Sequence, residues 1–203
     1  MPSPLFVGLS NVLARLRTSL IVGGPDYTAF SDADQDRALG YRLLASAAIE
    51  DFVEQRGREA ASEGAARFLK SQPTRAGRAL VAWHVAKTSS AEIPVKPSDF
   101  IPQLELVNSA STAYGQMASS THGMSSKDAR KLLFPVGLVP DSTVEGLFDR
   151  LDQLSGGRNV AAHVRVNRAR SLQPPDVEAS LVESILAGLE HVDDLIERAI
   201  KTE

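Results

Sequence analysis

Apolar side chains recur along most of the chain at the three- and four-residue spacing of an amphipathic α-helix, and no stretch alternates convincingly at the period of two that marks a β-strand. The closing segment, residues 177–200, shows the helical pattern best, and we expect one buried stripe of Val177, Leu181, Ile185, Leu189, Val192, Leu195 and Ile196. Only 5% of the residues are aromatic, whereas alanine and leucine recur throughout, which favours helices packed on small side chains. The sequence therefore predicts an all-α helical bundle.

Glycine and proline divide this pattern into separate helices. We expect helices over residues 4–22, 31–69, 74–88, 100–117, 126–133, 142–154 and 177–200. The second starts near Ser31 and is the longest, with a bend expected near Gly57 or Gly64. A length of 203 residues suffices for one hydrophobic core and gives no strong reason for a second. We therefore divide the chain into an N-terminal helical extension, residues 1–30, and one helical domain, residues 31–203.

The charge balance and the absence of cysteine exclude several classes of function. The formal net charge is −3, from 22 Lys and Arg against 25 Asp and Glu, whereas a protein that coats nucleic acid is usually basic over a whole face. Without cysteine there are no disulfides, no thiolate zinc sites and no cysteine nucleophile. The start of the chain lacks the pattern of a signal peptide, and no uncharged apolar run approaches the roughly 20 residues that cross a bilayer. We expect a cytoplasmic protein with no membrane partner.

One short segment combines residue types that can cleave RNA. It reads Arg158-Asn159-Val160-Ala161-Ala162-His163 and follows Gly156-Gly157 directly. A histidine can move a proton near neutral pH, and an arginine stays cationic and can hold a phosphate through two hydrogen bonds. On a helix, Asn159 lies one turn from His163 and can orient the imidazole or donate to a phosphate oxygen. We expect the glycine pair to let a helix begin at the segment, so that its free N–H groups favour an anion there.

These residues suit a cleavage that needs no metal ion. The 2′-hydroxyl of the RNA would attack the adjacent phosphorus while His163 moves a proton and Arg158 stabilises charge on the phosphorane. One histidine and one arginine are a small catalytic set. Two copies that meet across a twofold axis would supply both an acid and a base, so the expected assembly is a homodimer.

The segment resembles the R-x4–6-H signature of the HEPN family, as found in its RiboL-PSP-like subfamilies. Its surroundings are similar too, because a helix at residues 144–154 precedes it and a long helix follows. Upstream, residues 132–138 (LLFPVGL) resemble a family stretch of two leucines followed by glycine and an apolar residue. Residues 43–53 are similar to the early helix in which such proteins place an acidic residue. The resemblance covers roughly residues 35–200 and gives the first 30 residues no counterpart.

The resemblance implies a HEPN-type bundle with an extra N-terminal helix, two motifs in a shared dimer cleft, and endoribonuclease activity that needs no metal or cofactor. Family members commonly act as toxins or effectors in bacterial toxin–antitoxin or antiphage systems, so an antitoxin or defence-system protein is an expected partner beside the RNA substrate. Two alternatives are a non-catalytic HEPN module that binds a nucleotide or a partner protein, and a helical adaptor unrelated to the family. The presence of both Arg158 and His163 favours the enzyme, because degenerate members typically lose one.

Four further residues are candidates for supporting roles. Glu50 stands within a run of small and apolar residues, so it lies either on the wet edge of its helix or beside Arg158 or His163 as a supporting acid. The other three, Arg165, Arg168 and Arg170, follow the motif and form either an RNA phosphate track or a solvated loop.

A second pair of residues, Arg78 and His84, also satisfies the R-x4–6-H spacing. It lies in an apolar helical stretch and has no polar residue directly after the arginine. We therefore interpret this second copy as structural.

Overall fold

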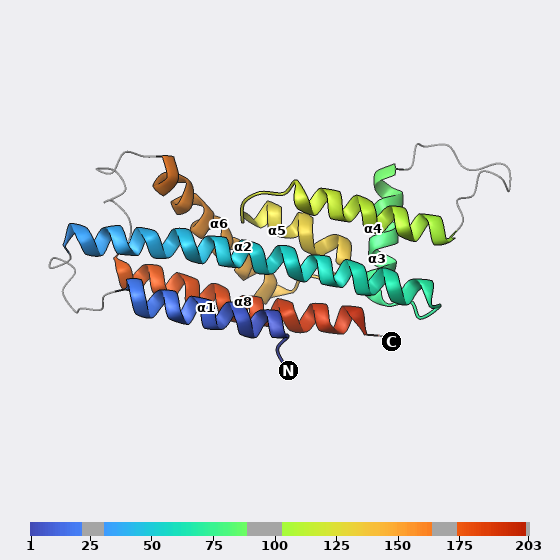
Figure 1. Ribbon diagram of the computed structural model, residues 1–203, viewed down its shortest axis with the longest axis horizontal. Coiled ribbons are helices and arrows are strands. Elements are labelled where there is room, and N and C mark those ends of the chain that lie inside the picture. The colour runs from blue at the N-terminus through green and yellow to red at the C-terminus, as the bar shows by residue number, and fades with distance from the viewer. Residues whose placement is uncertain (22–30, 89–102, 164–173, 202–203) are drawn as a thin grey trace. The chain divides into compact units, whose positions relative to one another are not determined.

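The computed structural model of the protein describes residues 1–21, 31–88, 103–163 and 174–201, and of residues 103 and 157–163 it describes the backbone alone. All regular secondary structure in these ranges is helical, so the all-α prediction is confirmed (Figure 1). The helices are α1 (Pro4–Leu20), α2 (Asp32–Leu69), α3 (Arg75–Thr88), α4 (Gln103–Ser119), α5 (Ser126–Leu133), the 3-10 turn η3 (Phe134–Val136), α6 (Ser142–His163) and α8 (Pro175–Ile200). A bilayer crossing would need a longer uninterrupted apolar helix than any found among the described residues.

The first two helices begin with side-chain caps that the sequence encodes locally. The backbone N–H of Phe6 donates to Ser3 Oγ at 3.2 Å, and Pro4 occupies the first helical position, where its missing N–H costs nothing. At α2, the backbone N–H of Asp34 donates to Ser31 Oγ and that of Ser31 donates to Asp34 Oδ2, at 3.3 and 3.0 Å. This reciprocal pair is a capping box and confirms the predicted start of the long helix.

The chain divides into two compact units that interleave along the sequence. Unit 1 comprises Met1–Phe52, Gly123–Ala129 and Pro140–Asp193, and unit 2 comprises Val53–His122, Arg130–Val139 and Asp194–Glu203. The helices α2, α5 and α8 each contribute residues to both units.

The core of unit 1 is built mainly from α6 and the first part of α8. Val144, Leu147, Leu151 and Leu154 of α6 are all at most 1% exposed, and their three- and four-residue spacing places them on one buried face of that helix. On α8, Ile185, Leu189 and Val192 are buried as predicted. Gly188 lets the two helices approach closely, since a Cβ there would stand 3.0 Å from Cβ of Leu147.

One residue of the predicted α8 stripe is exposed. Val177 is 40% exposed, and its neighbour Glu178 is buried in its place. Arg42 of α2 donates to the two carboxylate oxygens of Glu178 at 2.7 and 2.6 Å. This two-bond pair takes the inward position in the first turns of α8, where the two opposite charges compensate each other.

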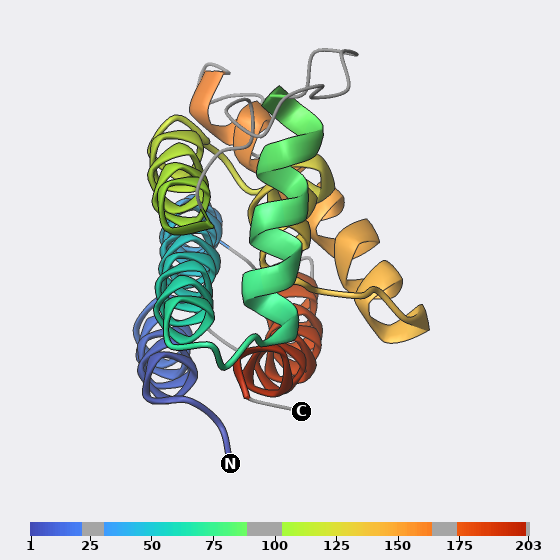
Figure 2. The ribbon, with the colours of Figure 1, turned by 90° about the vertical axis from the view of Figure 1, so that its right-hand side faces the viewer.

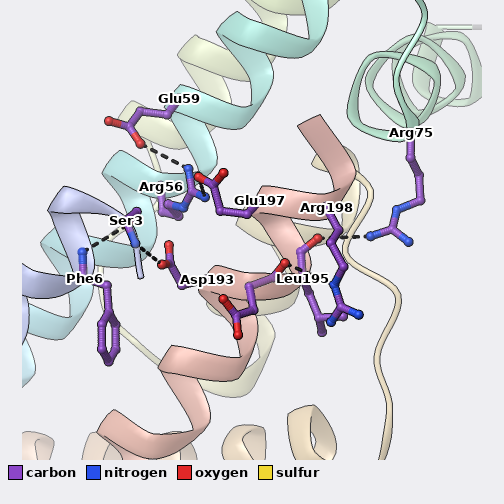
Figure 3. A network of polar contacts seen from close by, with 10 residues as sticks. Ser3, Phe6, Arg56, Glu59, Arg75, Asp193, Leu195, Glu197 and Arg198 are labelled. Atoms are coloured by element: carbon purple, nitrogen blue, oxygen red, sulfur yellow. Dashed lines mark hydrogen bonds and ion pairs between the residues drawn. The ribbon is translucent and has the colours of Figure 1, made fainter. Parts of the chain in front are cut away.

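The helix α1 packs within unit 1. The ring of Phe6 meets the ring of Phe52 edge to face at 6.0 Å between centroids. The backbone N–H of Ser3 donates to Asp193 Oδ2 at 2.7 Å, and Figure 3 shows this contact. Arg17 forms an ion pair with Glu183 of α8. The segment expected to be an extension therefore contacts both α2 and α8.

Glycines in unit 2 allow neighbouring segments of the chain to come into close contact. At Gly77 of α3, a Cβ would lie 2.5 Å from the carbonyl oxygen of Gly64 of α2, so the two backbones touch where these helices meet. Gly57 and Gly64 both lie inside α2, a single helix of 38 residues. Gly57 lies against the hydroxyl of Tyr114, and this hydroxyl donates a hydrogen bond to the Leu132 carbonyl at 2.8 Å. α3 runs crosswise to α4 (Figure 2).

Among the described residues, Arg56 has the largest fully buried side chain. It donates to Glu59 Oε2 at 3.2 Å and to Glu197 Oε1 at 2.6 Å, and Figure 3 shows both carboxylates beside it. Both partners belong to unit 2, so this ion-paired network joins α2 to the last turns of α8.

Candidate functional site

The segment Arg158–His163 forms the last six positions of α6, a helix of 22 residues that starts at Ser142. The expectation that Gly156-Gly157 interrupts the helix is therefore wrong. Each glycine costs roughly 1 kcal/mol in a helix interior, but the buried stripe of α6 anchors the preceding turns strongly enough to carry the helix through both.

This continuity changes the electrostatics expected at the segment. The free N–H groups of α6 lie at its start, where Asp141 Oδ1 accepts from the backbone N–H groups of Thr143 and Val144 at 3.0 Å each. Arg158 is in the last two turns, at the end where a helix presents its carbonyl groups and partial negative charge. Because the segment lies at the carbonyl end of α6, an anion there would depend on the cationic charge of Arg158 and not on the free N–H groups of this helix.

The helical backbone fixes the register of the segment. At 100° per residue, the Cα atoms of Asn159 and His163 lie one turn apart on the same side of the helix, and those of Arg158 and His163 lie about 140° apart. The contacts of these three side chains lie outside the described part of the structure. So do Arg165, Arg168 and Arg170, which were predicted as an RNA phosphate track.

Glu50 is half-buried on α2, and its carboxylate holds a loop. Its Oε1 atom accepts a hydrogen bond from the backbone N–H of Gly123 at 2.6 Å. Gly123 has a φ of +102°, in the region that favours glycine, so the loop turns sharply where Glu50 holds it. The acid that the sequence singled out thus has a defined partner in unit 1.

A second carboxylate, which the sequence did not single out, holds the same loop from α6. Asp152 Oδ1 accepts from the backbone N–H of Ser126 at 2.7 Å, at the start of α5. Asp152 precedes Asn159 by seven residues, so the two Cα positions lie on one side of the continuous helix. Only an exposed polar position marks Asp152 in the sequence, and nothing local reveals a partner 26 residues away.

The second Arg…His copy lies on α3 in unit 2. His84 Nδ1 is buried, and no residue in the described ranges gives it a hydrogen bond. Its ring lies 6.5 Å from the Trp83 ring, which Tyr114 meets edge to face and Lys87 covers at 5.3 Å. His84 therefore adjoins an aromatic cluster of unit 2 through Trp83.

Within the described ranges, no three His, Cys, Asp or Glu side chains gather closely enough to hold a metal ion. Comparison with known proteins finds no protein-family model, no curated protein and no solved structure that matches this chain.

Proposed function

We propose that this chain is a metal-independent endoribonuclease of the HEPN type that acts as a homodimer. The observation that carries the proposal is the segment Arg158–His163, in which a general acid–base residue and a permanent cation stand five positions apart. The helical backbone of α6 is consistent with it, because Asn159 is thereby one turn from His163, within reach of a side chain that orients the imidazole. The long closing helix α8 follows, in the order that the resemblance implies.

The proposed reaction is an intramolecular transesterification of RNA. The 2′-oxygen attacks the adjacent phosphorus, the bond from phosphorus to the 5′-oxygen breaks, and the products are a 2′,3′-cyclic phosphate and a 5′-hydroxyl. One proton leaves the 2′-hydroxyl for a base and one reaches the 5′-oxygen from an acid, and His163 of each copy would serve one of these roles. Arg158 stabilises the negative charge that builds on the phosphorane. Because one copy offers one histidine here, the shared cleft of a dimer completes the set.

The decisive experiment compares wild type, Arg158→Ala and His163→Ala for cleavage of total cellular RNA in EDTA. Cleavage by wild type that both substitutions reduce at least about a hundredfold supports the assignment, since general acid–base catalysis contributes roughly that much or more. Arg78→Ala and His84→Ala make the same changes in the second Arg…His copy and serve as matched controls. Cleavage that survives His163→Ala would refute the proposed site.

Two further readouts separate the enzyme from a silent module. Sedimentation equilibrium tests for the dimer, and end-group analysis tests for the cyclic phosphate. A folded wild-type dimer that leaves RNA intact would favour the binding module instead.

We also propose that the chain is a toxin or effector of a bacterial toxin–antitoxin or antiphage system. Induced wild type, but not His163→Ala, should then arrest bacterial growth.

A further inference from the structure

Unit 1 contains a pocket lined by described residues of three helices. It lies between α1, α2 and α8 and has a volume of about 500 Å³. The described residues that line it are Ser10, Leu13, Ala14, Arg17, Thr18, Ile21, Tyr41, Val182, Glu183 and Leu186. Volumes of roughly 300–1,000 Å³ are typical of sites for small molecules. The helix α1 supplies one wall, so the pocket depends on the packing of this helix against α2 and α8 within unit 1.

The interior of the pocket is apolar. Leu13 and Val182 are 3% and 1% exposed, so they form its inner surface, and Leu186 and Ile21 are half-buried beside them. Burial of an aliphatic group against such side chains is favourable by about 0.8 kcal/mol for each CH₂ that leaves water. The body of a ligand that fits this pocket is therefore a hydrocarbon.

Tyr41 brings a hydroxyl group to the wall of the pocket. Tyr41 is 1% exposed and is one of the residues that line the pocket. Burial raises the pKa of Tyr41 to about 12, so the hydroxyl keeps its proton at neutral pH and can both donate and accept. The head group of a ligand can therefore bond to this hydroxyl either as an acceptor or as a donor.

The charges at the pocket are balanced. Arg17 and Glu183 form an ion pair across it from α1 to α8, and each side chain is about half exposed. Glu178, the other charged group that acts on Tyr41 beside Arg17, is itself paired with Arg42. A ligand with an anionic head would meet Glu183, and one with a cationic head would meet Arg17. A neutral head that both donates and accepts can bond to both and to Tyr41.

We propose that the pocket between α1, α2 and α8 binds a small aliphatic molecule with an uncharged hydrogen-bonding head, such as a primary amide or an alcohol. The hydrocarbon body covers Leu13 and Val182, and the head bonds to Tyr41 and lies beside the Arg17–Glu183 ion pair. This ligand site is independent of the proposed RNA cleavage.

The test titrates the full chain with three probes of equal chain length, namely hexanamide, hexanoate and hexylamine, at neutral pH. Calorimetry measures affinity, and amide chemical shifts locate the binding at Leu13, Val182 and Leu186. We expect saturable binding of hexanamide, and affinity weaker by at least tenfold for both charged probes. Absence of saturable hexanamide binding overturns the proposal, as does equal binding of either charged probe.

Three substitutions sharpen the test. Tyr41→Phe removes only the hydroxyl and should weaken hexanamide binding about tenfold, the equivalent of one hydrogen bond. Ser10→Trp places an indole in the pocket wall and should abolish binding, which provides a second test if Tyr41→Phe does not fold. Glu183→Gln removes the negative charge and should let hexanoate bind at least tenfold more tightly than it binds wild type. The matched control is Tyr114→Phe, a buried tyrosine of unit 2 that should leave hexanamide binding unchanged; binding unaffected by Tyr41→Phe or by Ser10→Trp would refute the site.

Discussion

Glu50 Oε1 accepts a hydrogen bond from the backbone N–H of Gly123 at 2.6 Å, across 73 positions of sequence. The sequence marked this acid as a possible support of the proposed catalytic segment. In the structure its carboxylate holds the loop before α5. A variant that separates hydrogen bonding from charge can distinguish these roles.

We expect Glu50→Ala to lower the free energy of unfolding by about 1–3 kcal/mol, because the Gly123 N–H loses an ionised acceptor. Glu50→Gln should cost less, since its amide oxygen still accepts. Urea unfolding measures both variants. If Glu50→Gln folds normally but cleaves RNA at least tenfold more slowly, the negative charge supports catalysis, whereas unchanged cleavage limits Glu50 to holding the loop.

Gly77→Ala should destabilise unit 2 by about 1–3 kcal/mol, because the added methyl group meets the Gly64 carbonyl oxygen and backbone cannot move aside cheaply. Gly40→Ala, in the same helix as Gly64, is the matched control. A Cβ at Gly40 meets nothing within 4 Å, so this change should stabilise the protein by up to about 1 kcal/mol. Denaturant midpoints compare the two, and a Gly77→Ala protein as stable as wild type would contradict the close helix contact.

Arg42→Met should lower the free energy of unfolding by about 3–5 kcal/mol, because it leaves the buried Glu178 carboxylate without the guanidinium that pairs with it. Burial already raises the pKa of Glu178 against the attraction of Arg42, so the unpaired acid would tend to take up a proton. The double variant Arg42→Met, Glu178→Leu should regain most of the loss. Arg67→Met removes a half-buried i,i+4 pair with Glu63 and should lower the free energy of unfolding by no more than about 1 kcal/mol. Equal effects of the two single substitutions would contradict this account.

We expect Asp141 to contribute to the free energy of unfolding in a way that is lost in acid. Its Oδ2 lies 2.6 Å from His191 Nε2, and this hydrogen bond, followed by those from the backbone of Val144 and Thr143, lowers the pKa of Asp141 below 3.8. A carboxyl group with a lowered pKa in the folded state stabilises the fold above its unfolded pKa and loses that contribution as the pH falls through its folded pKa. The difference in unfolding free energy between wild type and Asp141→Asn should therefore be largest near neutral pH and shrink below pH 3.8. Urea titrations across this range measure it, and a difference that grows in acid would disprove the linkage.

The local sequence pattern was sufficient to predict the helices and much of the core. Leu147, Leu151 and Leu154 are buried as their spacing predicted, because periodicity depends only on neighbours one turn away. The capping box of Ser31 and Asp34 is equally local and marks the start of α2. The residue types of the segment Arg158–His163 and the chemistry they allow also come from the sequence, whereas their side-chain contacts lie outside the described part of the structure.

Tertiary structure decided the relationships between residues far apart in the chain. Val177 has the spacing of a core residue, yet Glu178 is buried in its place because Arg42, 136 positions away, supplies the compensating charge. Gly156-Gly157 resembles a helix end, yet α6 continues because burial of its earlier turns outweighs the cost of two glycines. The meeting of Tyr41, Arg17 and Glu183 around one pocket follows from the packing of α1 on α2 and α8. Periodicity and capping act over about four residues, so the sequence alone determines local helices. Pairing of distant charges and close backbone contacts depend on which helices pack together, and that is settled only in the folded chain.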